Sequence, residues 1–371
     1  AMTYYGRWTY KFEEAGRQGP DAALVIHETA PASYGWDVVS NSWTGGQYDL
    51  RRDASGPPRV KMEGWITRDV AERLFAEAGL DFEQAKAAAS EPGFTPIPMT
   101  GLSASGELTT SFENRESRNV GGLVRGSERP DEYVIYTAHW DHLGVDPDET
   151  ADDRIYNGAV DNGTGIAGVL EIGEMLAAMD TPPARSVLIL AVTAEESGLI
   201  GSEYFAINPV VPLEAIVAGV NIDGLQPTGV SRDITVVGYG ASELEDWLAA
   251  LIEPMDRRLS PDPRPEAGGY YRSDHISFAK RGVPMLNMRP GLDLVNGGVE
   301  AGRAVAEDYG THRYHAVTDE YREDWDLSGM TDYIQIMATL GLSLAESDQW
   351  PNWYEGNEFR ALRDAQRADA E

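Results

Sequence analysis

Short apolar, β-rich runs alternate with amphipathic helical runs from residue 119 onward, and this alternation constrains the fold more than any other feature. The predicted elements are a strand at 133–138, a helix at 161–179, a strand at 187–193, a helix at 198–207, a strand at 215–223 and a long final helix at 327–345. This pattern is typical of an α/β domain with a mostly parallel mixed sheet and helices on both faces. Because such sheets bind ligands at the carboxyl ends of their strands, functional residues are expected there.

The first 117 residues differ in character, with short strand-like runs, turns rich in Gly, Pro and Ser, and one helical run at 67–80. The polar stretch 100–119 has two open interpretations, an edge hairpin or a plain connection. We therefore predict two domains, a small β-rich region at 1–117 and the α/β domain at 118–371.

Composition restricts the chemistry. The chain has no cysteine, so disulfides, thiolate catalysis and cysteine zinc sites are excluded, and any metal must be held by His, Asp and Glu. A formal net charge of −31 argues against nucleic acid as a partner. We interpret the charge as a solvated acidic surface, with attraction of cationic peptides or metal ions as the alternative. No apolar run approaches the roughly 20 residues of a membrane span, and no pattern fixes an oligomeric state.

Histidines and carboxylates follow the predicted strands. The set is His139, Asp141, Asp161, Glu195, Glu196 and Asp223, with His312, His315 and Asp319 in a downstream loop. Taken singly, each is an ordinary helix cap or turn former. Taken together, so many carboxylates at one sheet edge would repel one another unless a cation lay among them. We therefore predict a metal centre, and two divalent ions offset the repulsion better than one.

Five ordered motifs carry a resemblance to the M28 metallopeptidases, the co-catalytic zinc aminopeptidases and their relatives. They are TAHWDH, NGAVDNGTG, TAEESGLIGS, NIDG and RYHAVTDE, and the resemblance covers Asn119 to about Glu358. It implies a zinc-exopeptidase type of α/β fold and a metal-binding hydrolase, a metalloprotease with two Zn²⁺ for which Co²⁺ or Mn²⁺ are substitutes. We expect an aminopeptidase acting on peptides.

The resemblance also implies a ligand set. One zinc takes His139 and Asp223, the other takes Glu196 and His315, and Asp161 bridges the two. The five side chains supply the nitrogen and oxygen donors that suit zinc.

Two further residues receive catalytic roles from the resemblance. Glu195 is the general base, and Asp141 is the carboxylate that orients the imidazole of His139. Adjacent side chains leave the backbone in different directions, so Glu196 can point to the metal while Glu195 faces the attacking water.

Substrate contacts are expected from the loop GGYYRSDH. The candidates are Tyr270, Tyr271, Arg272 and Asp274. As an alternative, Asp274 caps the helix that follows it. Arg272 and Arg289 keep a carboxypeptidase or dipeptidase open, an N-acyl amino acid amidohydrolase is a further alternative on the same site, and a non-catalytic scaffold is the alternative from another class.

Several neighbouring residues are expected to play lesser parts. His142 and His312 are interpreted as bystanders, and Asp319 either holds His315 or caps a turn. The acidic loop 146–153 is interpreted as solvated, because it lacks the residue order and glycine of a calcium-binding EF-hand loop.

The segment from Met2 to Gln47, with W-x-V-V-x-x-S-W at 36–43, resembles the second half of a protease-associated (PA) domain, which is inserted in many M28 peptidases. Such a domain commonly covers the active-site cleft and restricts substrate entry. Since the resemblance begins part-way through the domain, we expect a partial PA domain, and the two open alternatives are a truncated or processed chain and a reduced variant of the family. We also expect a secreted or periplasmic protein whose export signal is not in this chain.

Overall fold

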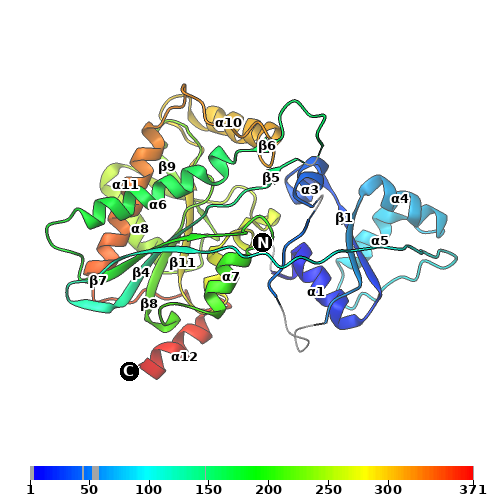
Figure 1. The fold of residues 1–371 in the computed structure, drawn as a ribbon, viewed down its shortest axis with the longest axis horizontal. Helices are drawn as coiled ribbons and strands as arrows, with labels where there is room; N and C mark the ends of the chain where they lie inside the picture. Colours follow the sequence, from blue (N-terminus) through cyan, green and yellow to red (C-terminus); the bar gives the residue numbers. More distant parts are fainter. Residues whose placement is uncertain (1–3, 44–45, 52–57, 147, 371) are drawn as a thin grey trace. The chain divides into compact units, whose positions relative to one another are not determined.

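The computed structural model describes residues 4–43, 46–51, 58–146 and 148–370 (Figure 1). The chain divides into two compact units. The larger comprises residues 37–51 and 117–371, and the smaller comprises residues 3–36 and 52–116. All the strand-end residues identified above belong to the larger unit, and that unit also takes in the short segment 37–51 from far upstream.

A seven-stranded mixed sheet forms the centre of the larger unit. Its strands are β3 (Val120–Val124), β4 (Arg129–His139), β7 (Arg185–Val192), β8 (Ile216–Asn221), β9 (Asp233–Val237), β10 (Arg258–Pro261) and β11 (Met285–Pro290), in the order β10-β9-β11-β8-β4-β7-β3. The β11–β9 and β3–β7 pairs are antiparallel and the other four are parallel. The prediction of a mostly parallel mixed sheet is confirmed.

Helices cover both faces of this sheet. On β4, Val134 and Tyr136 belong to a core shared with α6 (Thr164–Ala177), α8 (Leu244–Ile252) and α11 (Ser328–Glu346). Ile135 belongs to a second core with residues of α7 (Ile200–Ile207) and α9 (His275–Ala279). Figure 1 shows α6, α8 and α11 grouped together, with α7 across the strands from them. Successive strand residues point to opposite faces, so these near-continuous apolar strands are buried on both sides.

The predicted helix at 161–179 begins later than expected. Asp161 and Asn162 have non-helical backbone angles, the peptide bond between them is cis, and α6 starts at Thr164. The side-chain oxygen of Asn162 accepts the backbone N–H of Gly165 at 3.0 Å, which satisfies one of the free donors at the start of the helix. Asp161 therefore lies in the turn before the helix, where its carboxylate is free of a capping role.

Elements without a strong apolar pattern were missed by the sequence analysis. Among them are the edge strands β3 and β10, the two-residue strands β5 (Gly144–Val145) and β6 (Ile155–Tyr156), and the helices α10 (Gly298–His312) and α12 (Arg360–Ala370). Only Gly302 is buried in α10, so this helix has no apolar stripe from which a helical period could be read.

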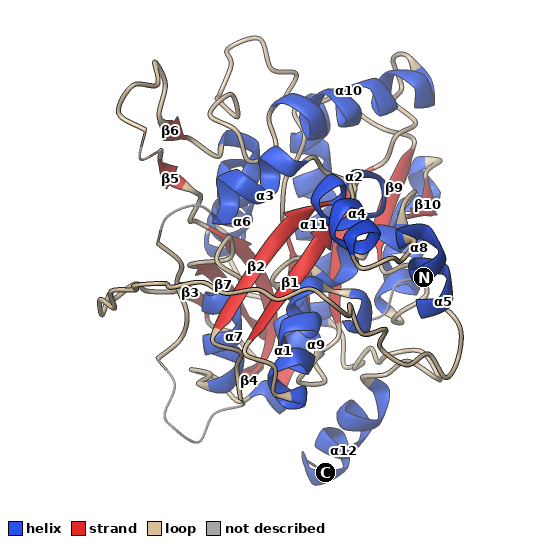
Figure 2. Ribbon diagram, turned by 90° about the vertical axis from the view of Figure 1, so that its right-hand side faces the viewer, coloured by secondary structure: helices blue, strands red, loops and turns tan. Residues whose placement is uncertain are grey.

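The smaller unit pairs a short parallel sheet with helices (Figure 2). Its elements are α1 (Trp8–Gln18), β1 (Ala22–His27), α2 (Thr29–Ala32), β2 (Met62–Thr67), α4 (Arg68–Glu77) and α5 (Phe82–Ala89). In α4 the predicted helical run is confirmed, with the hydroxyl of Thr67 accepting the N–H of Val70. The described part of this unit is mixed rather than β-rich, because two strands accompany these helices.

Between α5 and β3 the chain is a connection, since residues 90–119 contain no helix or strand. None of the helices in the described ranges combines the length and the apolar composition needed to cross a membrane.

Candidate metal centre

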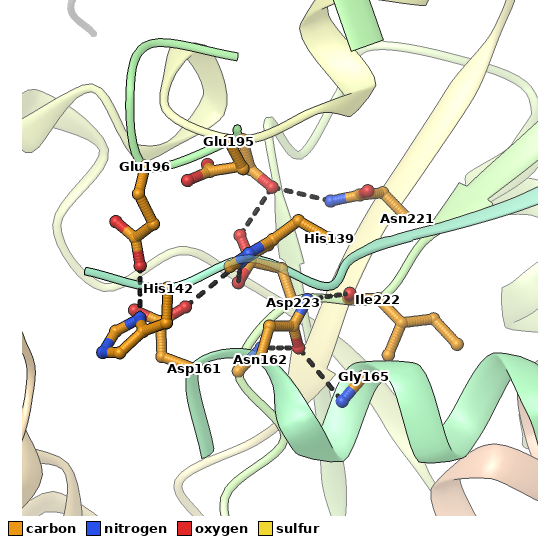
Figure 3. Close-up of polar contacts among 12 residues, drawn as sticks. His139, His142, Asp161, Asn162, Gly165, Glu195, Glu196, Asn221, Ile222 and Asp223 are labelled. Atoms are coloured by element: carbon orange, nitrogen blue, oxygen red, sulfur yellow. Dashed lines mark hydrogen bonds and ion pairs between the residues drawn. The ribbon is translucent and has the colours of Figure 1, made fainter. Parts of the chain in front are cut away.

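The carboxyl ends of three adjacent strands bring the candidate residues together. In the sheet β4 lies between β8 and β7 and runs parallel to both. His139 is the last residue of β4, Glu195 and Glu196 follow β7, and Asp223 follows β8. Figure 3 shows their side chains converging with Asp161 on one small volume.

Asp161 stands at the middle of this cluster. One carboxylate oxygen, Oδ1, lies 3.2 Å from Nε2 of His139, and the other, Oδ2, lies 3.3 Å from Nε2 of His315. The three side chains are buried. Each of the two oxygens of this carboxylate thus faces a different imidazole, which is the arrangement that a bridging ligand requires.

Each imidazole has a second carboxylate beside it. Asp223 Oδ1 lies 3.5 Å from Nε2 of His139, and Glu196 Oε2 lies 3.0 Å from Nε2 of His315. Two His–carboxylate pairs therefore share Asp161. The structure brings these five side chains together in the same pairs that the resemblance implied.

The adjacent glutamates diverge, as Figure 3 shows. Ala194, just before them, has a left-handed φ of 54°. The backbone carbonyl of Glu195 accepts the N–H groups of Gly198 and Leu199, which follow. This tight turn sends Glu196 toward Asp161 and leaves Glu195 on the side of His139. Burial raises the pKa of Glu195 well above its usual range, against the opposing effect of His139.

Asp141 acts on the site in a different way from the one expected. The carbonyl oxygen of Asp141, and not its carboxylate, lies within hydrogen-bond distance of Nδ1 of His139, at 3.1 Å, while the carboxylate is 3.8 Å away. The carboxylate instead accepts the backbone N–H of Glu195 at 3.0 Å and of Glu196 at 3.2 Å. Asp141 therefore ties the end of β4 to the turn that carries both glutamates.

Asp319 supports Asp161 rather than His315. Its carboxylate accepts the backbone N–H of Val160 at 3.1 Å and of Asp161 at 3.0 Å, and the hydroxyl of Tyr309 at 3.3 Å. Of the two alternatives for Asp319, the structure favours the cap of a turn over a bond to the imidazole of His315, because its oxygens accept N–H groups from the backbone of the turn before α6.

His142 belongs to the centre, although the sequence analysis treated it as a bystander. Its Nδ1 lies 2.6 Å from Oε1 of Glu196, whose other oxygen faces His315 (Figure 3). The available signal was its place at the same strand end as His139, three residues later. His312, by contrast, is exposed at the end of α10.

The predicted substrate residues lie in different surroundings, and Arg272 lies near the imidazole of His315. Arg272 lies 3.4 Å from the hydroxyl of Tyr314, whose ring stacks on His315 with centroids 4.0 Å apart. Tyr271 bonds Glu358. Asp274 is fully buried and makes no capping bond to α9, so it lines no open surface and the capping alternative is unsupported.

The donor set fits divalent metal ions. Although burial alone would lower it, the pKa of His139 is raised well above its usual range by Glu195, Asp161 and Asp223. The pKa of His315 is raised in the same way by Glu196 and Asp161. A buried site so negative that it favours protonated imidazoles calls for positive charge, and its nitrogen and oxygen donors suit Zn²⁺.

Outside this cluster, the acidic loop satisfies its carboxylates locally. Asp146 accepts the N–H of Asp148, Asp148 accepts that of Thr150, and Asp153 accepts that of Ile155. Among the described residues, the groups of side chains able to hold a metal ion include none from this loop, and their members are His139, His142, Asp161, Glu195, Glu196 and Asp223.

Comparison with known proteins places the chain in a family. The model of peptidase family M28 matches residues 119–340. The Aminopeptidase NAALADL1 of Mus musculus is 36% identical over 217 residues, covering 56% of this chain and 26% of that protein. The Glutamate carboxypeptidase 2 homolog of Caenorhabditis elegans is 29% identical over 278 residues, covering 67% of this chain and 31% of that protein. The chain thus spans about a third or less of the length of these relatives.

Among solved structures, the aminopeptidase from Aneurinibacillus sp. strain AM-1 is similar with a TM-score of 0.49 at 16% identity, covering 94% of this chain and 68% of that one. The family match spans more than half of the chain and contains all five motifs, from the HWDH stretch to the loop of His315. This chain is a member of peptidase family M28.

Proposed function

We propose that the protein is a co-catalytic di-zinc exopeptidase, specifically an aminopeptidase that removes N-terminal residues from peptides. The observation that carries the proposal is the position of Asp161 between two His–carboxylate pairs. Membership of family M28 and the similarity to an aminopeptidase and to a carboxypeptidase homolog support an exopeptidase.

Five residues of this chain would hold the two ions. His139 and Asp223 would hold one, His315 and Glu196 the other, and Asp161 both. Bound zinc supplies Lewis acidity toward the peptide carbonyl and toward water. Co²⁺ and Mn²⁺ are substitutes that the same donors would accept.

The chain itself supplies the proton transfer. Glu195 is the proposed general base, which takes a proton from the attacking water and returns it to the leaving amine. Burial raises the pKa of Glu195, whereas cations beside it would favour the carboxylate that a general base requires. Asp141 accepts the backbone N–H groups of Glu195 and Glu196 and so fixes the proposed base and the proposed metal ligand relative to each other.

A carboxypeptidase, a dipeptidase or an N-acyl amino acid amidohydrolase is the second candidate function. Arg272 favours it, because this cation lies beside Tyr314, next to His315, where it could bind a substrate carboxylate. A non-catalytic scaffold is less well supported, since all five proposed ligands and Glu195 are present.

A panel of matched substrates tests the assignment. We expect cleavage of amino-acid nitroanilides with a free α-amine, and no cleavage of the same compounds after N-acetylation. Preference for blocked substrates with a free carboxylate would establish the second candidate instead. If the zinc-loaded chain cleaved no member of a broad peptide library, only the non-catalytic scaffold would remain as a candidate function.

The remaining expectations stay part of the proposal. The resemblance of residues 2–47 supports a PA-related segment at the start of this chain. A secreted or periplasmic location is tested by fractionating the source cells and detecting the protein immunologically, and recovery only from the cytoplasm would contradict it.

A further inference from the structure

Two side chains of the upstream helix α3 (Trp36–Trp43) contact the proposed metal ligand His315, more than 270 positions along the chain. Ser42 Oγ lies 2.8 Å from Nδ1 of the imidazole. The side-chain amide of Asn41 donates to the backbone carbonyl of His315 at 3.0 Å. Residues 37–51 and His315 belong to the same compact unit, so these contacts lie within one body.

The backbone at His315 needs such support. Its φ is 56°, in the left-handed region that a residue with a side chain adopts only at a cost in free energy. The bond from Asn41 to the carbonyl of His315 stabilises this conformation. On the imidazole itself, Tyr314 covers one face and Ser42 meets Nδ1, while Nε2 faces Asp161 and Glu196.

The two ring nitrogens of His315 must have different roles if Nε2 is to bind a metal ion. A metal-ligating histidine donates its other ring N–H to an oxygen, which fixes both the tautomer and the orientation of the ring. The carbonyl of Asp141 stands at that position for His139. For His315, the hydroxyl of Ser42 stands there.

We propose that Ser42 is a positioning residue for the second metal ion. Its hydroxyl accepts the Nδ1–H of His315, which leaves Nε2 unprotonated and directed at the site between Asp161 and Glu196, while Asn41 holds the backbone beneath. The proposed metal centre is therefore supported by residues of the upstream segment 37–51, which belongs to the same compact unit. This inference rests on the proposed function, because it requires zinc at His315.

Four variants of the full chain test it, one of which is Asn41→Ala. Ser42→Ala removes the acceptor, Ser42→Thr restores a hydroxyl, and Ser40→Ala makes the same chemical change on the same helix, where the Ser40 hydroxyl donates to the backbone carbonyl of Asp37. Zinc is titrated into each metal-free protein against a chromophoric chelator, the visible spectrum of the cobalt-loaded form is recorded, and the Tm of the metal-free form is measured.

We expect Ser42→Ala to weaken one of two zinc-binding steps by about 10- to 100-fold and to alter the cobalt spectrum. The other step and the metal-free Tm should stay at the wild-type values. Ser42→Thr should restore the affinity, and Ser40→Ala should match the wild type. Asn41→Ala should weaken the same step as Ser42→Ala.

Three results would overturn the inference. The first is a Ser42→Ala variant that binds two zinc ions as tightly as the wild type. The second is an equal loss at both steps together with a lower metal-free Tm, which would show a general structural role. The third is a wild-type chain that binds no zinc, and only this one also overturns the proposed function.

Discussion

Replacing Asp161 with Ala is expected to abolish tight binding of both zinc ions and, with it, peptidase activity. The carboxylate of Asp161 faces both imidazoles, at 3.2 Å and 3.3 Å. Without it, each ion would lose a ligand, and the charges of two cations held close together would be left uncompensated. Metal content is measured by mass spectrometry after gel filtration of zinc-loaded protein.

Asp180→Ala is the matched control, because this aspartate is exposed just beyond α6. It should keep both ions and full activity. Circular dichroism of the metal-free variants separates loss of metal from loss of fold. An Asp161→Ala protein that retains two tightly bound zinc ions would show that the bridging role is wrong.

Replacing Glu195 with Gln should leave both zinc ions bound but strongly reduce the rate. We expect kcat to fall by about 10²- to 10⁴-fold, the usual contribution of a general base. Zinc content should be unchanged, because Glu196 and not Glu195 faces His315. The measurement combines kcat on the best substrate of the panel with metal analysis of the same sample.

Glu171→Gln provides the control for this variant, since Glu171 is exposed on α6 and the substitution is chemically identical. Two results would contradict the account. Wild-type kcat in Glu195→Gln would remove the base assignment, and loss of zinc would show that Glu195 is itself a ligand.

The two predictions separate the roles of the carboxylates at this edge of the sheet. Asp161→Ala removes the metal and the rate together, whereas Glu195→Gln removes the rate alone. The distinction follows from the turn after β7, where Ala194 and the bonds to the carbonyl of Glu195 send consecutive side chains in different directions. Asp141 fixes this turn through the two backbone N–H groups.

The core of the fold was predictable because its strands are continuous apolar runs. The runs around Tyr136, Ile189 and Val220 form β4, β7 and β8, which lie side by side in the sheet. Parallel neighbours end at the same edge, so residues that follow these strands had to meet. This reasoning reaches His139, Glu195, Glu196 and Asp223 without knowledge of any loop.

Residues that act through loops were not predictable in this way. For Asp319 two roles stay open from the sequence, because the path of its loop decides which N–H groups its oxygens meet. The contact of His142 with Glu196 is not predictable, because sequence spacing gives no direction for a side chain beyond the end of a strand. The contact of Ser42 with His315 joins positions 273 apart, and no local pattern in 36–43 indicates it.

The domain organisation shows the same limit. Composition changes near residue 117, and the sequence analysis placed a boundary there. The segment 37–51 nevertheless packs with the larger unit. Its helix α3 buries Val38 and Val39, an apolar pair that marks a helix face needing a partner but does not identify that partner.

The metal content of the purified wild-type protein tests the central claim most directly. It is measured by mass spectrometry, with activity on a free-amine nitroanilide recorded before chelation, after chelation and after zinc is returned. We predict two zinc ions per chain, loss of activity on chelation and recovery with zinc. A folded protein that binds no metal even when zinc is supplied would contradict the account.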